Sequence, residues 1–146
     1  MSGRLVQLML RALDLLSALL PQRNSPPHLR TGVRGEEEAY FYLRRHGYVV
    51  VARNYRTPRS RSELDMVAWE GETLCFIEVK TRTSRSYQPA ELAVDYDKQR
   101  DLSRVARAFM RKIAGQPPLR FDVLSVYLEP GHPSDFVLFK NAFSMA

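Results

Sequence analysis

The stretch "ELDMVAWEGETLCFIEVK", from Glu63 to Lys80, holds two short apolar runs that meet at a turn. This pattern predicts two strands, 63–69 and 73–81, joined as a hairpin. Carboxylates lie inside both runs, although acidic side chains are poor strand formers and are costly to bury. Acids in these positions therefore require either a compensating interaction or a functional role.

The faces of the two strands show which acids can meet. Side chains alternate along a strand, so Glu63 and Asp65 share a face, as do Glu78 and Lys80. With an even number of loop residues, all four charged groups point to the same side of the hairpin. The other side then carries apolar residues that suit packing beneath a helix: Leu64, Met66, Ile77 and Val79.

The loop length sets which residues lie opposite each other. A loop of residues 70–71, or of residues 69–72, places Glu63 opposite Glu78 and makes Asp65 and Glu78 diagonal neighbours. Their Cα atoms would then be roughly 7–8 Å apart, close enough for a cation to lie between the carboxylates. A loop with an odd number of residues would put these two acids on opposite faces.

Clustered carboxylates repel one another, which raises their pKa values unless a cation compensates. Oxygen ligands without His or Cys favour Mg²⁺ or Mn²⁺ over zinc, and we expect Asp65, Glu78 and Glu63 to be the metal ligands. Lys80 adds a positive donor for a water or a phosphate oxygen. This set fits metal-assisted phosphodiester hydrolysis. The alternative is a solvated charged face on which Lys80 only pairs with an acid.

The rest of the chain predicts an α/β domain with a mixed sheet. A helix is expected from Thr31 to His46 with Gly47 as its C-cap, and a longer helix from 95 to 113. Further strands are expected at 48–56, 119–128 and 135–140. Three parts follow: an amphipathic helix at 1–20, a Pro-rich linker at 21–30 and a domain at 31–146. Charged residues interrupt residues 1–20, so no membrane span is expected.

The charge balance indicates a polyanionic partner. The 146 residues include 22 Lys and Arg against 16 Asp and Glu, a net charge of +6. Nucleic acid is the first candidate partner and an anionic membrane surface the second. Cys75 is the one cysteine, which indicates a reducing, cytoplasmic location. The N-terminal helix also suits docking to a partner such as the second copy of a homodimer.

Basic residues flank the hairpin acids on both sides. The long helix carries Arg at spacings of four, three and four on the face opposite its apolar stripe, and Arg matches phosphate bidentately. An ordinary solvated helix face is the alternative. No motif for reading base sequence is present, so we expect backbone or shape recognition of DNA rather than RNA. The predicted nucleic-acid contacts are Arg56, Arg61, Arg82, Lys98, Arg100, Arg104, Arg107 and Arg111.

The segments "ELD" and "EVK", separated by twelve residues, resemble the PD-(D/E)xK signature of restriction-endonuclease-like nucleases. The wider pattern of "RGEEEAYFYLRRHGYVVVARNYR", "SELDMVA", "FIEVKTR", "DKQRDL" and "RFDVLSV" resembles the bacterial YraN-like family, related in fold to archaeal Holliday-junction resolvases. The resemblance covers about residues 30–127. Ser62 stands where that family usually has Gly.

This resemblance implies a three-layer restriction-endonuclease-like fold, a mixed central sheet flanked by helices. It also implies a metal-dependent nuclease acting on DNA, branched or structured, with Asp65, Glu78 and Lys80 as catalytic residues. Glu36 shares a helical stripe with Ala39 and would complete the site, unless it only complements the helix dipole. The alternative function is a non-catalytic nucleic-acid-binding or adaptor module on the same scaffold.

Overall fold

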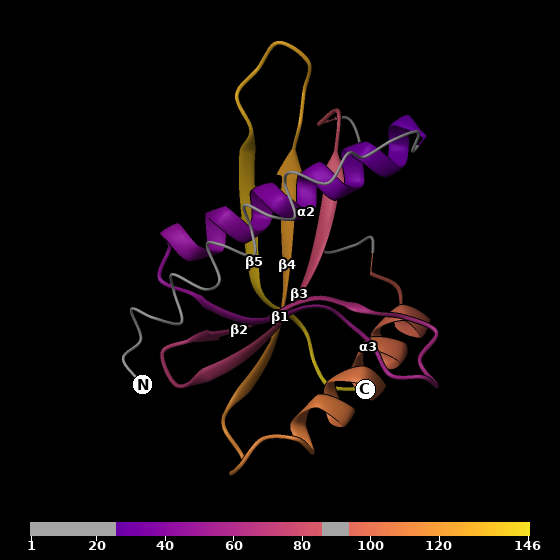
Figure 1. Ribbon diagram of the computed structural model, residues 1–146, viewed down its shortest axis with the longest axis vertical. Helices are drawn as coiled ribbons and strands as arrows, with labels where there is room; N and C mark the ends of the chain where they lie inside the picture. The colour runs from indigo at the N-terminus through magenta and orange to yellow at the C-terminus, as the bar shows by residue number, and fades with distance from the viewer. Residues whose placement is uncertain (1–25, 86–93) are drawn as a thin grey trace. The chain divides into compact units, whose positions relative to one another are not determined.

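The computed structural model of this protein describes residues 26–85 and 94–146. In this part of the chain two helices and five strands follow one another (Figure 1). Their bounds are α2 Pro27–Arg45, β1 Val49–Tyr55, β2 Leu64–Glu70, β3 Thr73–Arg82, α3 Tyr96–Met110, β4 Leu119–Tyr127 and β5 Asp135–Phe143. The amphipathic helix expected at 1–20 lies outside the described residues.

The five strands form one mixed sheet in the order β1-β2-β3-β4-β5. All neighbours are antiparallel except β3 and β4, which are parallel and are separated in sequence by α3. A parallel pair needs such a long connection, which is why the helical pattern lies between these two strands. The predicted mixed α/β architecture is confirmed.

Helix α2 begins at Pro27, not near Thr31, so residues 27–30 of the expected linker are helical. Proline suits the first turn of a helix because its missing N–H has no partner there in any case. At the other end Gly47 has a φ of +85°, and the N–H of Tyr48 donates to the carbonyl of Leu43 at 3.0 Å. The predicted glycine C-cap is thus present as a Schellman-type ending.

The two helices pack on two separate apolar clusters because side chains alternate along β3. Ile77 and Val79 belong to the cluster that includes Ala39, Tyr40 and Leu43 of α2. Phe76 belongs to the cluster of α3, in which the expected helical stripe is present: Leu102, Val105, Ala106, Phe109, Met110 and Ile113. The result is a helix–sheet–helix layering. No helix in the described ranges has the length and apolar character needed to cross a membrane.

Leu64 departs from the expected face. It was predicted to lie with Met66 on one side of the hairpin, but it packs in the α3 cluster whereas Met66 packs in the α2 cluster. Leu64 is the first residue of β2 and pairs with Tyr55 of β1, whose ring lies edge-on to Phe109 of α3 at 5.1 Å. At this end, β1 and β2 diverge from β3 and pack against α3.

Candidate active site

The hairpin loop is two residues long but lies one position later than expected. Glu70 pairs with Thr73, so the loop is Gly71-Glu72, and Gly71 has a φ of +59°. Glycine at the first loop position is the signature of a type II′ hairpin turn. The register therefore shifts by two residues from the predicted one, and within the paired part of the hairpin the two-residue period keeps the side chains on their expected faces.

This register brings the two central acids closer than predicted. The β2–β3 ladder ends at the pair of Met66 and Ile77, and one further step along the two strands places Asp65 opposite Glu78. Beyond that pair, the N–H of Val79 donates to Oδ2 of Asp65 at 2.7 Å. Directly opposed side chains are closer than diagonal ones. Asp65 and Glu78, hereafter the acidic pair, thus lie at the point where β2 leaves β3, and Glu63 falls opposite Lys80 instead of Glu78.

The acidic pair is only partly satisfied by its neighbours. Burial, and then the charge of Glu78, raises the pKa of Asp65 to about 8, although the Val79 N–H opposes this shift. The Glu78 side chain is 8% exposed, and its Oε2 atom is buried with no hydrogen-bond partner among the described residues. A buried carboxylate oxygen without a partner costs about 1–3 kcal/mol or more. A cation would supply the partner that this oxygen lacks.

Two lysines share the other oxygen of Glu78. The ammonium of Lys80 lies 3.5 Å from Oε1, and that of Lys98, from the first turn of α3, lies 3.8 Å from the same atom. Lys80 therefore lies beside Glu78, on the side of the hairpin that was predicted. Lys98, which was expected on the nucleic-acid surface, reaches the acidic pair from a different layer.

Gly35 places the helix acid beside this site. A Cβ atom on Gly35 would meet Oγ1 of Thr81 at 1.9 Å, so α2 lies directly on β3. The neighbouring Glu36 is half-buried, and burial, then the charge of Glu63, raises its pKa. The charge of Glu78 raises that pKa further, whereas Arg53 lowers it. Glu36 is thus electrostatically coupled to Glu63 and Glu78, and its role in the site stays a prediction.

The donor set fits a divalent cation of the Mg²⁺ or Mn²⁺ class. Asp65 and Glu78 offer carboxylate oxygens, and Oε2 of Glu78 lacks any other partner. Within residues 26–85 and 94–146, no group of three or more His, Cys, Asp or Glu side chains is gathered as a metal site. Mg²⁺ often uses only one or two carboxylates and completes its shell with waters and phosphate oxygens. The metal-ligand role of Glu63 stays a prediction.

Ser125 is a site neighbour that the sequence did not reveal. It pairs with Lys80 across the parallel β3–β4 ladder and is fully buried, and in residues 26–85 and 94–146 its hydroxyl has no hydrogen-bond partner. Its neighbours Leu124 and Val126 face the α2 cluster, so Ser125 faces α3 as Glu78 does. The only available sequence signal was a Ser inside an apolar strand, and the β3–β4 register was unknown.

A groove of about 390 Å³ lies between the loop after β1 and helix α3. It carries four arginines against one aspartate, and Asp101 pairs with Arg104 at 3.5 Å. We call it the basic groove; it is lined by Thr57, Pro58, Arg59, Ser60, Arg61, Asp101, Arg104, Ala108 and Arg111. The structure thus brings Arg61, Arg104 and Arg111 together and adds Arg59, which the sequence-based set omitted.

The other predicted nucleic-acid residues are dispersed. Arg56 and Arg100 are exposed, and Arg82 is half-buried at the end of β3. Arg107 donates a hydrogen bond to the carbonyl of Ala146 near the C-terminus and lines a different hollow. Of the predicted row of four helix arginines, Arg104 and Arg111 line the basic groove, and nucleic-acid binding by the row stays a prediction.

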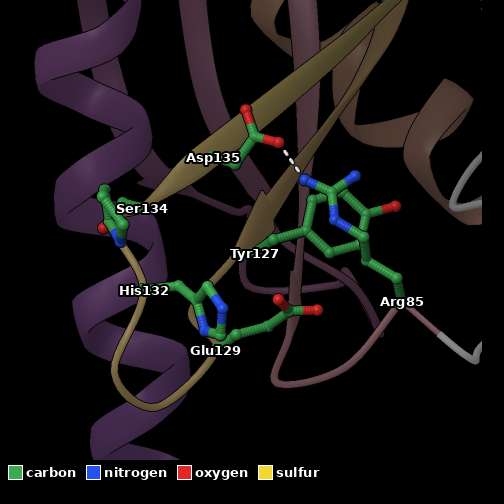
Figure 2. A pocket seen from close by; sticks show the side chains of 7 residues that line it. Arg85, Tyr127, Glu129, His132, Ser134 and Asp135 are labelled. Carbon is green, nitrogen blue, oxygen red and sulfur yellow. Dashed lines mark hydrogen bonds and ion pairs between the residues drawn. The ribbon is translucent and has the colours of Figure 1, made fainter.

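A second hollow, of about 370 Å³, lies where β4 leads into β5 (Figure 2). Arg85 enters it with its guanidinium 4.4 Å from the centre of the Tyr127 ring, and it forms an ion pair with Asp135. Glu129 and His132 lie on its other side. Arg85 follows the hairpin in sequence, but its charge is already matched here, whereas the four arginines of the basic groove share one aspartate.

Comparison with known proteins places these residues in a family. The family model described as "Uncharacterised protein family UPF0102" matches residues 35–126, which contain the acidic pair, Lys80 and Lys98. A UPF0102 protein of Koribacter versatilis is 53% identical over 135 residues, 92% of this chain and 94% of the relative. UPF0102 proteins of Solibacter usitatus and Pelobacter propionicus are 46% and 42% identical over 65% and 83% of this chain, and 73% and 87% of theirs. The YraN-like resemblance is confirmed, and the chain belongs to the UPF0102 family.

Proposed function

We propose that this protein is a Mg²⁺- or Mn²⁺-dependent nuclease with a restriction-endonuclease-like fold that cleaves DNA. One observation carries the proposal: the half-buried carboxylate of Asp65 lies beside the buried carboxylate of Glu78, one step beyond the β2–β3 ladder, and an oxygen of Glu78 has no partner among the described residues. The order of helix, three strands, helix and strand, with β3 and β4 parallel, supports the fold assignment. The preference for branched or structured DNA rests on the resemblance to junction resolvases.

Each residue of the site has its own role in the proposed reaction. Asp65 and Glu78 would hold the cation, with Glu63 or Glu36 assisting. The bound cation would supply an activated water and offset negative charge on the phosphate. Lys80 would orient that water or stabilise the pentacovalent phosphate. Glu36, whose pKa is raised, would hold a proton near the reacting groups at neutral pH more readily than an exposed acid.

The basic groove would bind the phosphate backbone. Arg59 and Arg61 come from one wall and Arg104 and Arg111 from the other, so a strand between them would meet guanidinium groups on both sides. This arrangement supports recognition of the backbone instead of the base sequence. The one cysteine, Cys75, is free and buried, in keeping with the cytoplasmic location that we propose.

Cleavage of a panel of junction, flap, single-strand and duplex substrates in Mn²⁺ tests the proposal. Wild type should cleave at least one substrate, and Asp65→Asn and Glu78→Gln should each lose about 100-fold or more in rate. Glu36→Gln should lose activity, whereas Glu37→Gln provides the matched control because Glu37 is exposed on the same helical turn. Cleavage that survives both Asp65→Asn and Glu78→Gln would place the activity at another site or in a contaminant.

The rival function is a non-catalytic nucleic-acid-binding or adaptor module. It is favoured by the absence of a third clustered ligand among the described residues and by the two lysines that already neutralise Glu78. Such a module would bind DNA equally well in EDTA and in Mn²⁺ and would cleave none of the panel. Metal-dependent cleavage lost in Asp65→Asn would exclude it.

A further inference from the structure

Lys98 is the side chain that reaches the acidic pair from outside the hairpin. Its ammonium lies 3.8 Å from Oε1 of Glu78, and its side chain is 33% exposed. Lys80, the other cation on this oxygen, extends from the same strand as Glu78, two residues later. Lys98 comes instead from the first turn of α3. Its charge is therefore brought to Glu78 by the packing of α3.

Charge and space make Lys98 a competitor of a divalent cation. Two ammonium groups and a divalent ion within about 4 Å of one buried carboxylate repel one another strongly, since neither solvent nor salt screens them well there. Glu78 is 8% exposed, so the screening at this atom is weak. One positive group must withdraw when a metal is held by both acids.

The backbone of Lys98 is fixed, whereas its side chain is able to move. The N–H of Lys98 donates to Oδ1 of the N-cap Asp95 at 2.8 Å, so the first turn of α3 holds its place. The four-carbon side chain reaches the protein surface. Asp101, one helical turn farther along, lines the basic groove. The ammonium can therefore leave Glu78 for solvent or for a phosphate without a movement of the helix.

We propose that Lys98 serves as an internal counter-ion of the acidic pair, and that it is displaced when Asp65 and Glu78 bind a divalent cation. This inference rests on the proposed metal site. Lys98 keeps the metal-free site partly neutral and lowers its affinity for the cation. A polyanion in the basic groove that draws the ammonium away from Glu78 raises that affinity, so substrate and metal favour each other's binding.

Titration calorimetry with MnCl₂ on the full-length protein tests this role. Lys98→Met removes the charge and keeps the length of the side chain, and it should bind Mn²⁺ at least about fivefold more tightly than wild type. Lys98→Arg keeps a positive charge and should bind like wild type. Lys112→Met is the matched control, because Lys112 is exposed near the end of α3 and contacts the Tyr55 ring instead of an acid.

The outcomes separate this inference from the proposed function. Tighter binding by Lys98→Met alone supports it, as does Mn²⁺ binding that is detectable only in Lys98→Met. If wild type binds Mn²⁺ and Lys98→Met binds it equally or more weakly, the counter-ion role is overturned and the metal site remains. If none of the four proteins binds Mn²⁺ at millimolar concentration, the metal site itself is refuted and the counter-ion role with it.

Discussion

The same sheet buries carboxylates on its two faces in opposite ways. On the α2 face, Arg120 donates to both oxygens of the fully buried Asp122 at 2.7 and 2.8 Å, and to Glu70 at 2.5 Å. On the α3 face, the acidic pair leaves an oxygen of Glu78 without a partner. The first group, hereafter the arginine-centred cluster, is Tyr48, Glu70, Arg120, Asp122 and Lys140.

The arginine-centred cluster and the acidic pair shift the pKa values of their carboxyl groups in opposite directions. A hydrogen bond from Lys140, and then those from Arg120, lower the pKa of Glu70 to about 2, whereas the pKa of Asp65 is raised to about 8. Asp122 also accepts the N–H of Asn141, a residue with a φ of +54° beside the irregularity of the β4–β5 ladder. A satisfied polar network fixes a strand geometry, whereas an unsatisfied one remains able to bind a ligand.

The largest expected effect is on stability, in the arginine-centred cluster. Arg120→Met leaves Asp122 buried without its cation and should lower the free energy of unfolding by about 3–5 kcal/mol, measured in urea. The double variant Arg120→Met/Asp122→Leu should recover part of the loss, because an apolar pair needs no partner although the N–H of Asn141 loses its acceptor. A loss of less than about 1 kcal/mol in the free energy of unfolding of the single variant would show that the arginine-centred cluster does not stabilise the fold.

In the acidic pair, removal of a charge should stabilise the metal-free protein. A folded-state pKa raised above the unfolded value makes Asp65 unfavourable to folding as pH rises from about 4 to about 8. In EDTA, Asp65→Asn should therefore raise the melting temperature by about 4 °C or more at pH 8 and leave it unchanged at pH 4. Equal melting temperatures at pH 8 would mean that Asp65 is already compensated. The exposed Asp97→Asn is a suitable control.

The contact that places Glu36 should tolerate no added atom. Gly35→Ala puts a methyl group against Thr81 and should cost about 1–3 kcal/mol, with a loss of activity as α2 moves from β3. Gly32→Ala, on the same helix with nothing within 4 Å of the new atom, should instead stabilise by about 0.5–1 kcal/mol. Equal effects of the two substitutions in urea would refute the close contact.

The smallest effect on folding is expected in the basic groove. Arg104→Ala/Arg111→Ala should change stability by no more than about 0.5 kcal/mol per site and should reduce the log–log salt slope of duplex binding by about two units. Arg85→Ala should leave the slope unchanged, since Arg85 is paired with Asp135. A slope that falls equally in both variants, measured by fluorescence anisotropy, would mean that binding is not localised to the groove.

Much of this comparison was predictable from the sequence. Period-two alternation located the faces of Asp65 and Glu78, and helical spacing gave both the cluster of α3 and the inward side of Glu36. The predicted pairing register was wrong by two residues. The loops Glu70-Gly71 and Gly71-Glu72 assign the hairpin side chains to the same faces, so alternation alone does not distinguish them. The II′ preference for glycine at the first loop position selects the second. The start of α2 was missed because its Pro27 was interpreted as part of a linker.

What the sequence lacked was the pairing of distant elements. Lys98 was assigned to a surface because helical spacing cannot show which strand residue meets the first turn of α3. Arg120 and Lys140 converge on Glu70 from 50 and 70 residues away, and no local pattern encodes that. The position of Ser125 beside Lys80 likewise could not be predicted without the register of β3 and β4. These contacts come from topology, and local propensity carries no information about them.

The most direct test of the central claim is an anomalous difference map from crystals soaked in MnCl₂. The account predicts a Mn²⁺ peak between the carboxylates of Asp65 and Glu78, with the Lys98 ammonium moved away from Oε1 of Glu78. The same soak of Asp65→Asn should give no peak there. A wild-type map without a peak at the acidic pair, at Mn²⁺ concentrations that occupy other sites, would contradict the claim that these two acids form a metal centre.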